Sequence, residues 1–64
     1  IEEMLQKGIA RLTDKQRIVY VMNVYQGMKV SEISDTLRDN YKNVESRLGI
    51  ARKEIRQFMH KMLA

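Results

Sequence analysis

The sequence contains no cysteine and no proline, and only one histidine and three glycines among its 64 residues. Without cysteine it has no disulfide, no thiolate zinc site and no cysteine nucleophile. Since His60 is the only histidine, a metal site built from several histidines is excluded. Gly8, Gly27 and Gly49 lie too far apart to form a glycine-rich phosphate loop. We therefore expect no cofactor and no metal site. No nucleophile–base pair or pair of carboxylates indicates an enzyme.

The chain is also short and lacks a long apolar run. Its length suits one small domain, in which roughly 60% of the unfolded surface becomes buried. It is too short for separate catalytic and substrate domains. No apolar run approaches the ~18 residues that cross a membrane, so we expect no membrane insertion. Because the chain begins at Ile1 and not at Met, we expect residues 1–64 to be one domain from a longer protein.

The charge is unevenly distributed. The chain has 12 basic and 8 acidic residues, a net charge of +4. Residues 1–40 hold six of each sign, whereas residues 41–64 hold six basic and two acidic residues. The excess in the last third favours a polyanionic partner, nucleic acid first and an anionic membrane surface second. The alternative is an ordinary solvated helix face.

Apolar residues recur at helical spacing along the whole chain, which predicts helices and no strands. A first amphipathic segment ends near Leu12. Thr13 and Gln16 then have the spacing of a capping box, so a second helix is expected to begin near Asp14. It is expected to end at Gly27, in a left-handed conformation. Because this second helix is apolar nearly all round, it is predicted to be the most buried one.

Two further helices are predicted after Gly27. Ser31 is a suitable N-cap for a brief third helix, whose inner face would be Ile33 and Leu37. A tight turn follows at residues 38–40, with Asp39 or Asn40 as the next cap. The last helix should run from about residue 41 toward residue 63. Its predicted inward stripe is Val44, Leu48, Ala51, Ile55, Phe58 or Met59, and Met62. The sequence therefore predicts an all-α, compact four-helix domain.

The third and fourth helices, joined by a short turn, have the arrangement of a helix-turn-helix. Val44 and Leu48 would anchor the fourth helix, which leaves its opposite face free. That face carries residue types that pair with base edges or phosphates. They are Tyr41, Lys42, Asn43, Glu45, Ser46 and Arg47. Glu45 has a second possible role, which is pairing with Lys42 or Arg52 on its own helix. Ser31 and the helix N-terminus beside it are suited to a phosphate.

Three segments resemble region 4 of bacterial sigma factors, most closely those of the extracytoplasmic-function group. They are residues 12–20 (LTDKQRIVY), 25–37 (YQGMKVSEISDTL) and 43–56 (NVESRLGIARKEIR). The resemblance implies a four-helix domain in the bacterial cytoplasm that reads the −35 promoter element in double-stranded DNA. It also implies docking on the β-subunit flap of the RNA polymerase core, and masking by an anti-sigma factor.

The resemblance assigns roles to individual residues. It implies base contacts from Lys42, Asn43, Glu45, Ser46 and Arg47. It implies contacts to the DNA sugar-phosphate backbone from Arg17, Lys29, Ser31 and Arg52. Tyr41 is added to this group because its phenol hydroxyl can bind a phosphate. The chain departs from the family at the turn, where the usual Gly-Ile-Ser is Arg38-Asp39-Asn40. The apolar residue that ordinarily plugs the core at this turn is therefore missing.

The C-terminal end carries more apolar residues than one helix end needs to bury. They are Phe58, Met59, Met62 and Leu63. Either they pack against Ile1, Met4 and Leu5 of the first helix, or they form a docking surface for the flap or an anti-sigma helix.

Two rival functions belong to other classes. One is the helix-turn-helix effector domain of a response regulator or quorum-type activator. The residues Gln16-Arg17 and Ala51-Arg52-Lys53 favour the sigma factor over it. The other is a helical protein-interaction module without a role on DNA, which would be indifferent to replacement of Asn43 and Arg47.

Overall fold

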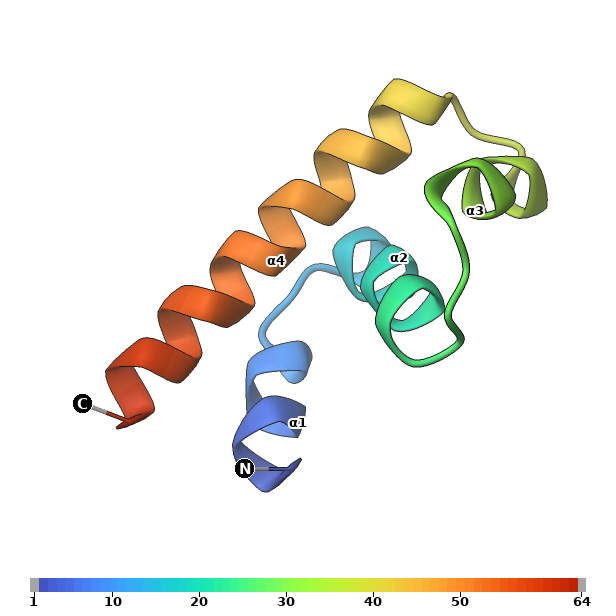
Figure 1. Ribbon diagram of the computed structural model, residues 1–64. Helices are drawn as coiled ribbons and strands as arrows, with labels where there is room; N and C mark the ends of the chain where they lie inside the picture. Colours follow the sequence, from blue (N-terminus) through green and yellow to red (C-terminus); the bar gives the residue numbers. More distant parts are fainter. Residues whose placement is uncertain (1, 64) are drawn as a thin grey trace.

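Four helices make up the part of the chain that the computed structural model describes, residues 2–63. They are α1 (Glu2–Ala10), α2 (Asp14–Val24), α3 (Val30–Leu37) and α4 (Tyr41–Leu63). The long α4 contacts each of the other three helices. Figure 1 shows α3 beside the N-terminal end of α4, and α1 beside its C-terminal half. The predicted all-α, four-helix architecture is confirmed. None of these helices is both long enough and apolar enough to cross a membrane.

The core lies where α2, α3 and α4 meet. Val19, Ile33 and Val44 come from these three helices and are the largest side chains that are fully buried. The predicted inward stripe of α4 is confirmed over three turns, because the α4 residues that are buried recur every three or four positions from Val44 to Ile55. The buried residues are Ile9, Leu12, Val19, Tyr20, Ile33, Val44, Leu48, Ala51 and Ile55.

The start of α2 agrees with the sequence prediction. The Gln16 amide donates to the Thr13 hydroxyl over 3.2 Å, and the Thr13 amide donates to the Gln16 side chain over 3.1 Å. These reciprocal bonds satisfy two amides that have no partner within the helix. Gly27 has the predicted left-handed backbone, with a φ of 68°. The helix itself ends earlier, at Val24.

The prediction that α2 is the most buried helix is confirmed, because a larger share of its residues is buried or half-buried than in the other three helices. Val19 and Tyr20 are buried, and Val21 and Met22 are partly buried against the core. Burial is nevertheless incomplete, since Ile18 and Val24 are exposed, as is Tyr25 directly after the helix. Other helices cover α2 on part of its surface only, so an apolar sequence did not guarantee burial.

The N-cap of α3 was predicted wrongly. Lys29 is the N-cap, and Ser31 lies inside the first turn. The Lys29 amide donates to the Glu32 carboxylate over 2.8 Å, so this amide has a hydrogen-bonding partner although Lys29 provides no capping hydroxyl. The inner face of α3 is also narrower than predicted, because Ile33 is fully buried whereas Leu37 remains 37% exposed.

The predicted turn at residues 38–40 is present and is held by hydrogen bonds. Arg38 adopts a left-handed conformation, with φ 54° and ψ 44°. The Asp39 amide donates to the Ser34 carbonyl over 3.0 Å, and the Ser34 hydroxyl donates to the Asp39 carbonyl over 2.5 Å. Asn40 caps α4, since its side-chain oxygen accepts from the Lys42 amide over 2.7 Å. The turn therefore fixes where α4 begins.

Candidate nucleic-acid interface

The first two turns of α4 have one buried face and one free face. Val44 and Leu48 anchor the helix in the core, as predicted. The free face carries four of the five residues predicted to contact bases, all exposed: Lys42, Asn43, Glu45 and Ser46. Among residues 2–63, Glu45 forms no ion pair, so the expected alternative pairing with Lys42 or Arg52 is not observed. A polar helix face of this kind is available to a groove of DNA.

Arg47, the fifth predicted base contact, is drawn back toward the turn. Its Nη1 donates to Asp39 Oδ2 over 2.9 Å. Asp39 Oδ1 accepts from the Asn40 amide over 2.7 Å and from the Asn43 side-chain amide over 3.3 Å. These hydrogen bonds lower the pKa of Asp39 below its ordinary value, and the bond from Arg47 has the largest effect. Two predicted base-contacting residues thus share one carboxylate.

The sequence prediction missed Asp39, which was considered only as a cap. The sequence did contain a pattern that could have indicated its contacts with Asn43 and Arg47, because these three residues are spaced four apart. Residues at this spacing lie on one face of a helix. The long Arg47 side chain points back toward the N-terminus of α4, so it spans the eight residues to Asp39.

Arg17, a predicted phosphate contact, binds the end of α1. Its guanidinium donates to the carbonyls of Leu12 over 2.9 Å and of Ile9 and Ala10 over 3.3 Å each. It also forms an ion pair with Asp14 at 3.2 Å. Helix-terminal carbonyls have no partner within the helix, so a cation that binds them stabilises the helix end. The predicted phosphate contact of Arg17 would add to this structural role.

Arg52 also has a partner within the fold. Its Nη2 donates to the side-chain oxygen of Asn23, and the side-chain amide Nδ2 of Asn23 donates to the Met28 carbonyl over 2.8 Å. This pair of bonds joins the middle of α4 to the segment after α2. The other residues predicted to contact the DNA backbone are exposed at the beginnings of α3 and α4; they are Lys29, Ser31 and Tyr41. The first-turn amides of a helix offer donors to an anion.

The predicted docking residues at the C-terminal end of α4 divide into two pairs. Phe58 and Met59 are half-buried, Phe58 beside Gly8 of α1 and Met59 against the core. Met62 and Leu63 are exposed, so the prediction that Met62 belongs to the inward stripe was wrong: half of its surface is accessible. The alternative, packing against α1, therefore holds for Phe58. Its predicted contact with Ile1 lies outside the described residues.

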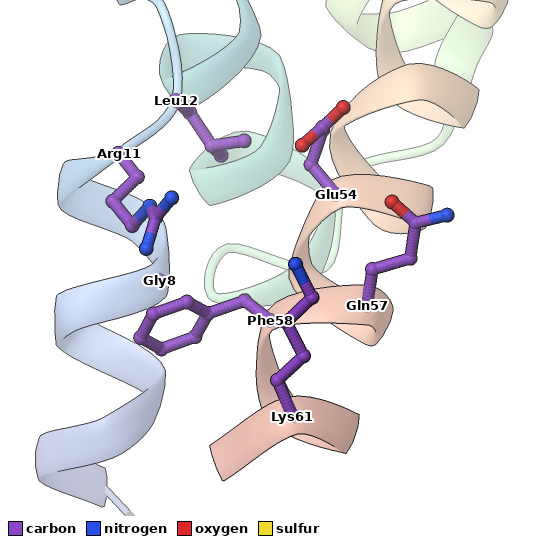
Figure 2. Close-up of a pocket in the computed structure, with 7 residues that line it drawn as sticks. All are labelled: Gly8, Arg11, Leu12, Glu54, Gln57, Phe58 and Lys61. Atoms are coloured by element: carbon purple, nitrogen blue, oxygen red, sulfur yellow. The ribbon is translucent and has the colours of Figure 1, made fainter.

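A cavity of about 180 Å³ lies between α1 and the C-terminal half of α4. Figure 2 shows the Phe58 ring extending from α4 toward α1, with Arg11 and Leu12 on the opposite wall. The Arg11 guanidinium lies 5.2 Å from the centre of the Phe58 ring, a cation–π distance. Glu54, Gln57 and Lys61 line the remainder, so the lining is mostly polar. Nowhere in residues 2–63 do three His, Asp or Glu side chains gather to hold a metal ion.

An exposed apolar stripe on α2 was not anticipated from the sequence. Ile18 lies in α2, and Tyr25, seven residues further along, directly follows the helix; each leaves nearly half of its surface accessible. Val21 and Met22 lie between them and are partly buried. We call these four residues the α2 stripe. The Tyr25 hydroxyl accepts from the Gln6 side chain over 3.0 Å, which ties the end of the stripe to α1.

Comparison with known protein families places most of the chain in an established family. Residues 2–55 match the family described as Sigma-70, region 4. The match covers α1, α2, α3 and most of α4, including every residue predicted to contact DNA. It ends before Phe58, so the predicted docking residues lie outside it. Searches of curated proteins and of solved structures gave no significant match.

Proposed function

The chain belongs to the sigma-70 region 4 family, and on that basis we propose that it recognises the −35 element of bacterial promoters. The family is the promoter-binding, non-catalytic helix-turn-helix domain of sigma factors. The chain is therefore a DNA-binding domain of transcription initiation. Its place of action would be the bacterial cytoplasm.

One observation carries the proposal: the division of the N-terminal half of α4 into an anchored and a free face. Because Val44 and Leu48 are buried, their helix cannot rotate, and its free face keeps Lys42, Asn43 and Ser46 outward. In a helix-turn-helix, this part of the second helix enters the major groove. Asn pairs with adenine and Arg with guanine, so the face supplies the donors and acceptors that read sequence.

We further propose that positive charge around this face supplies affinity that does not depend on sequence. Lys29 is the clearest candidate, because it is exposed and has no ion-pair partner among residues 2–63. Arg17 and Arg52 would add phosphate contacts, although each also stabilises the fold. Contacts to phosphates release counterions, so their contribution falls as salt rises.

The proposed partners besides DNA are the β-subunit flap of RNA polymerase and an anti-sigma factor. Exposed apolar residues support a docking role, and they occur at Met62 and Leu63 and on the α2 stripe. A small domain buries little DNA surface by itself. Attachment to polymerase would raise its effective concentration at the promoter.

The test compares three variants on a mixed-sequence duplex and on duplexes selected for tight binding. Arg47→Ala should lose discrimination between the two, while Lys29→Ala should weaken binding to both about equally. Lys29→Ala should also reduce the slope of log K against log salt by about 1. The control is Lys7→Ala, which removes the same charge from α1 near the opposite end of α4. The base-reading role is refuted if Arg47→Ala weakens every duplex alike.

A further inference from the structure

Asp39, Asn43 and Arg47 form a connected group at the point where the turn meets α4. The carboxylate of Asp39 accepts from Arg47 over 2.9 Å and from Asn43 over 3.3 Å. The Asp39 and Arg47 side chains are only 28% and 23% exposed. The other ion pair in residues 2–63, Arg17–Asp14, has an almost fully exposed carboxylate. The Asp39–Arg47 pair is therefore the better shielded of the two, and it is less weakened by solvent.

The geometry of the pair leaves part of the guanidinium unused. A guanidinium has five N–H donors in a planar fork, and Asp39 takes one of them, on Nη1. Among the described residues, Asp39 is the one hydrogen-bonding partner of the Arg47 side chain. The edge formed by Nε and Nη2 keeps two parallel donors, the number that a guanine accepts at O6 and N7. Binding to Asp39 is thus compatible with bidentate binding to a base.

We propose that Asp39 is a positioning residue for base recognition, which holds the Arg47 guanidinium so that its Nε–Nη2 edge faces a guanine. The inference rests on the proposed function, because it requires that the free face of α4 enters the major groove. A free arginine side chain must give up rotamer freedom to form a bidentate contact. The contact with Asp39 restricts that freedom before DNA arrives, and pre-organisation of this kind strengthens binding.

The position of Asp39 supports a positioning role over one in binding DNA directly. A carboxylate repels phosphates, but this one is paired with a cation and bonded to the Asn40 amide over 2.7 Å. The same hydrogen bonds keep the pKa of Asp39 low, so the group is ionised at neutral pH. Asn43, whose side chain also donates to Asp39, is restrained by the same carboxylate.

The experiment is a selection from a randomised duplex library with the 64-residue chain, followed by sequencing of the bound pool. Five proteins are compared: wild type, Arg47→Ala, Asp39→Asn, Asp39→Ala and Asp35→Asn. Asp39→Asn keeps the shape of the side chain and removes its charge. Asp35→Asn is the matched control, because it removes one negative charge from an exposed position on α3. Asp39→Ala, which removes both oxygens, serves as a second variant, and thermal unfolding reports whether each protein is folded.

The expected result is a local loss of preference. Arg47→Ala identifies the base pairs that Arg47 reads, where a bidentate contact gives about 5- to 150-fold discrimination. Asp39→Asn should lower the preference at those same base pairs by about fivefold or more and leave the others unchanged. Asp35→Asn should leave every preference unchanged.

Three results would overturn the inference and are distinguishable from one another. If Asp39→Asn and Asp39→Ala keep the preference at these base pairs or sharpen it, Asp39 does not position Arg47. If they lower the preference equally at all positions, Asp39 acts only on the structure of the turn. If the wild type shows no preference at any position, the proposed function fails, and the inference fails with it.

Discussion

Two glycines offer a direct test of the packing between α1 and α4. Gly8 lies in α1 and Gly49 in α4, and each is replaced by alanine. Alanine favours a helix over glycine by about 1 kcal/mol, and somewhat less near a helix end such as that of Gly8. A Cβ at Gly49 would meet no atom within 4 Å, so Gly49→Ala should stabilise the domain by about 1 kcal/mol.

Gly8 differs because its helix is packed against α4. A Cβ there would lie 2.9 Å from Cδ2 of Phe58 and 3.2 Å from Cδ1 of Ile55. The Phe58 ring lies against the Arg11 guanidinium on one side, so a shift of the ring would disturb that contact. Overpacking typically costs about 1–3 kcal/mol. We therefore expect Gly8→Ala to be less stable than Gly49→Ala by about 1–3 kcal/mol.

The assay is thermal and urea unfolding of both variants. For a domain of this size, 1 kcal/mol corresponds to about 4–8 °C in Tm. A double-mutant cycle with Phe58→Ala isolates the cause, since without the ring Gly8→Ala should become more favourable than in the wild type. The reasoning is refuted if Gly8→Ala stabilises the domain as much as Gly49→Ala does.

Two further predictions concern the turn between α3 and α4. Arg38→Gly should stabilise the domain by up to about 1 kcal/mol in urea unfolding, because the left-handed conformation of a non-glycine residue costs roughly 1–2 kcal/mol and glycine's larger unfolded-state entropy offsets part of the gain. Arg38→Ala, the control, should not show this gain. Lowering the pH should weaken the turn, since the folded-state pKa of Asp39 lies below its ordinary value of 3.8. Its contribution is present above that value and is lost as the pH falls through the folded-state pKa. The difference in Tm between wild type and Asp39→Asn should therefore be constant near neutral pH and close below about pH 3.8. A difference that is the same at pH 2 as at pH 7 would contradict this assignment.

Local features of the fold were predictable because their causes are local. The capping box of Thr13 and Gln16, the left-handed Gly27 and the cap of α4 at Asn40 each depend on residues within a few positions of one another. The stripe from Val44 to Ile55 follows from the helical period. The N-cap of α3 was missed because the Glu32 carboxylate binds the Lys29 amide. Lys29 can therefore be the N-cap without a capping hydroxyl of its own, and the usual preference for serine at this position did not determine where α3 begins.

The candidate site was predictable as a surface, but the partners of its side chains were not. The sequence indicated a polar face on the first turns of α4, and the helical period places that face opposite Val44 and Leu48. Its predicted members were Lys42, Asn43, Glu45, Ser46 and Arg47. It did not indicate that Arg17 binds the end of α1 or that Arg52 reaches Asn23, 29 residues away in the sequence. The distribution of charge along the sequence does not show whether an arginine has a hydrogen-bonding partner within the fold.

What the sequence determined by itself was the set of helices, most of their boundaries, the inward stripe of α4 and the basic character of its other face. Periodicity and capping act over at most a few residues, so they can be read along the chain. The tertiary structure alone decided that Ile18 and Tyr25 stay exposed and that Asp39 holds Arg47. Those outcomes depend on how the helices are placed in space, because burial and hydrogen bonding require a neighbour that only the packed fold supplies.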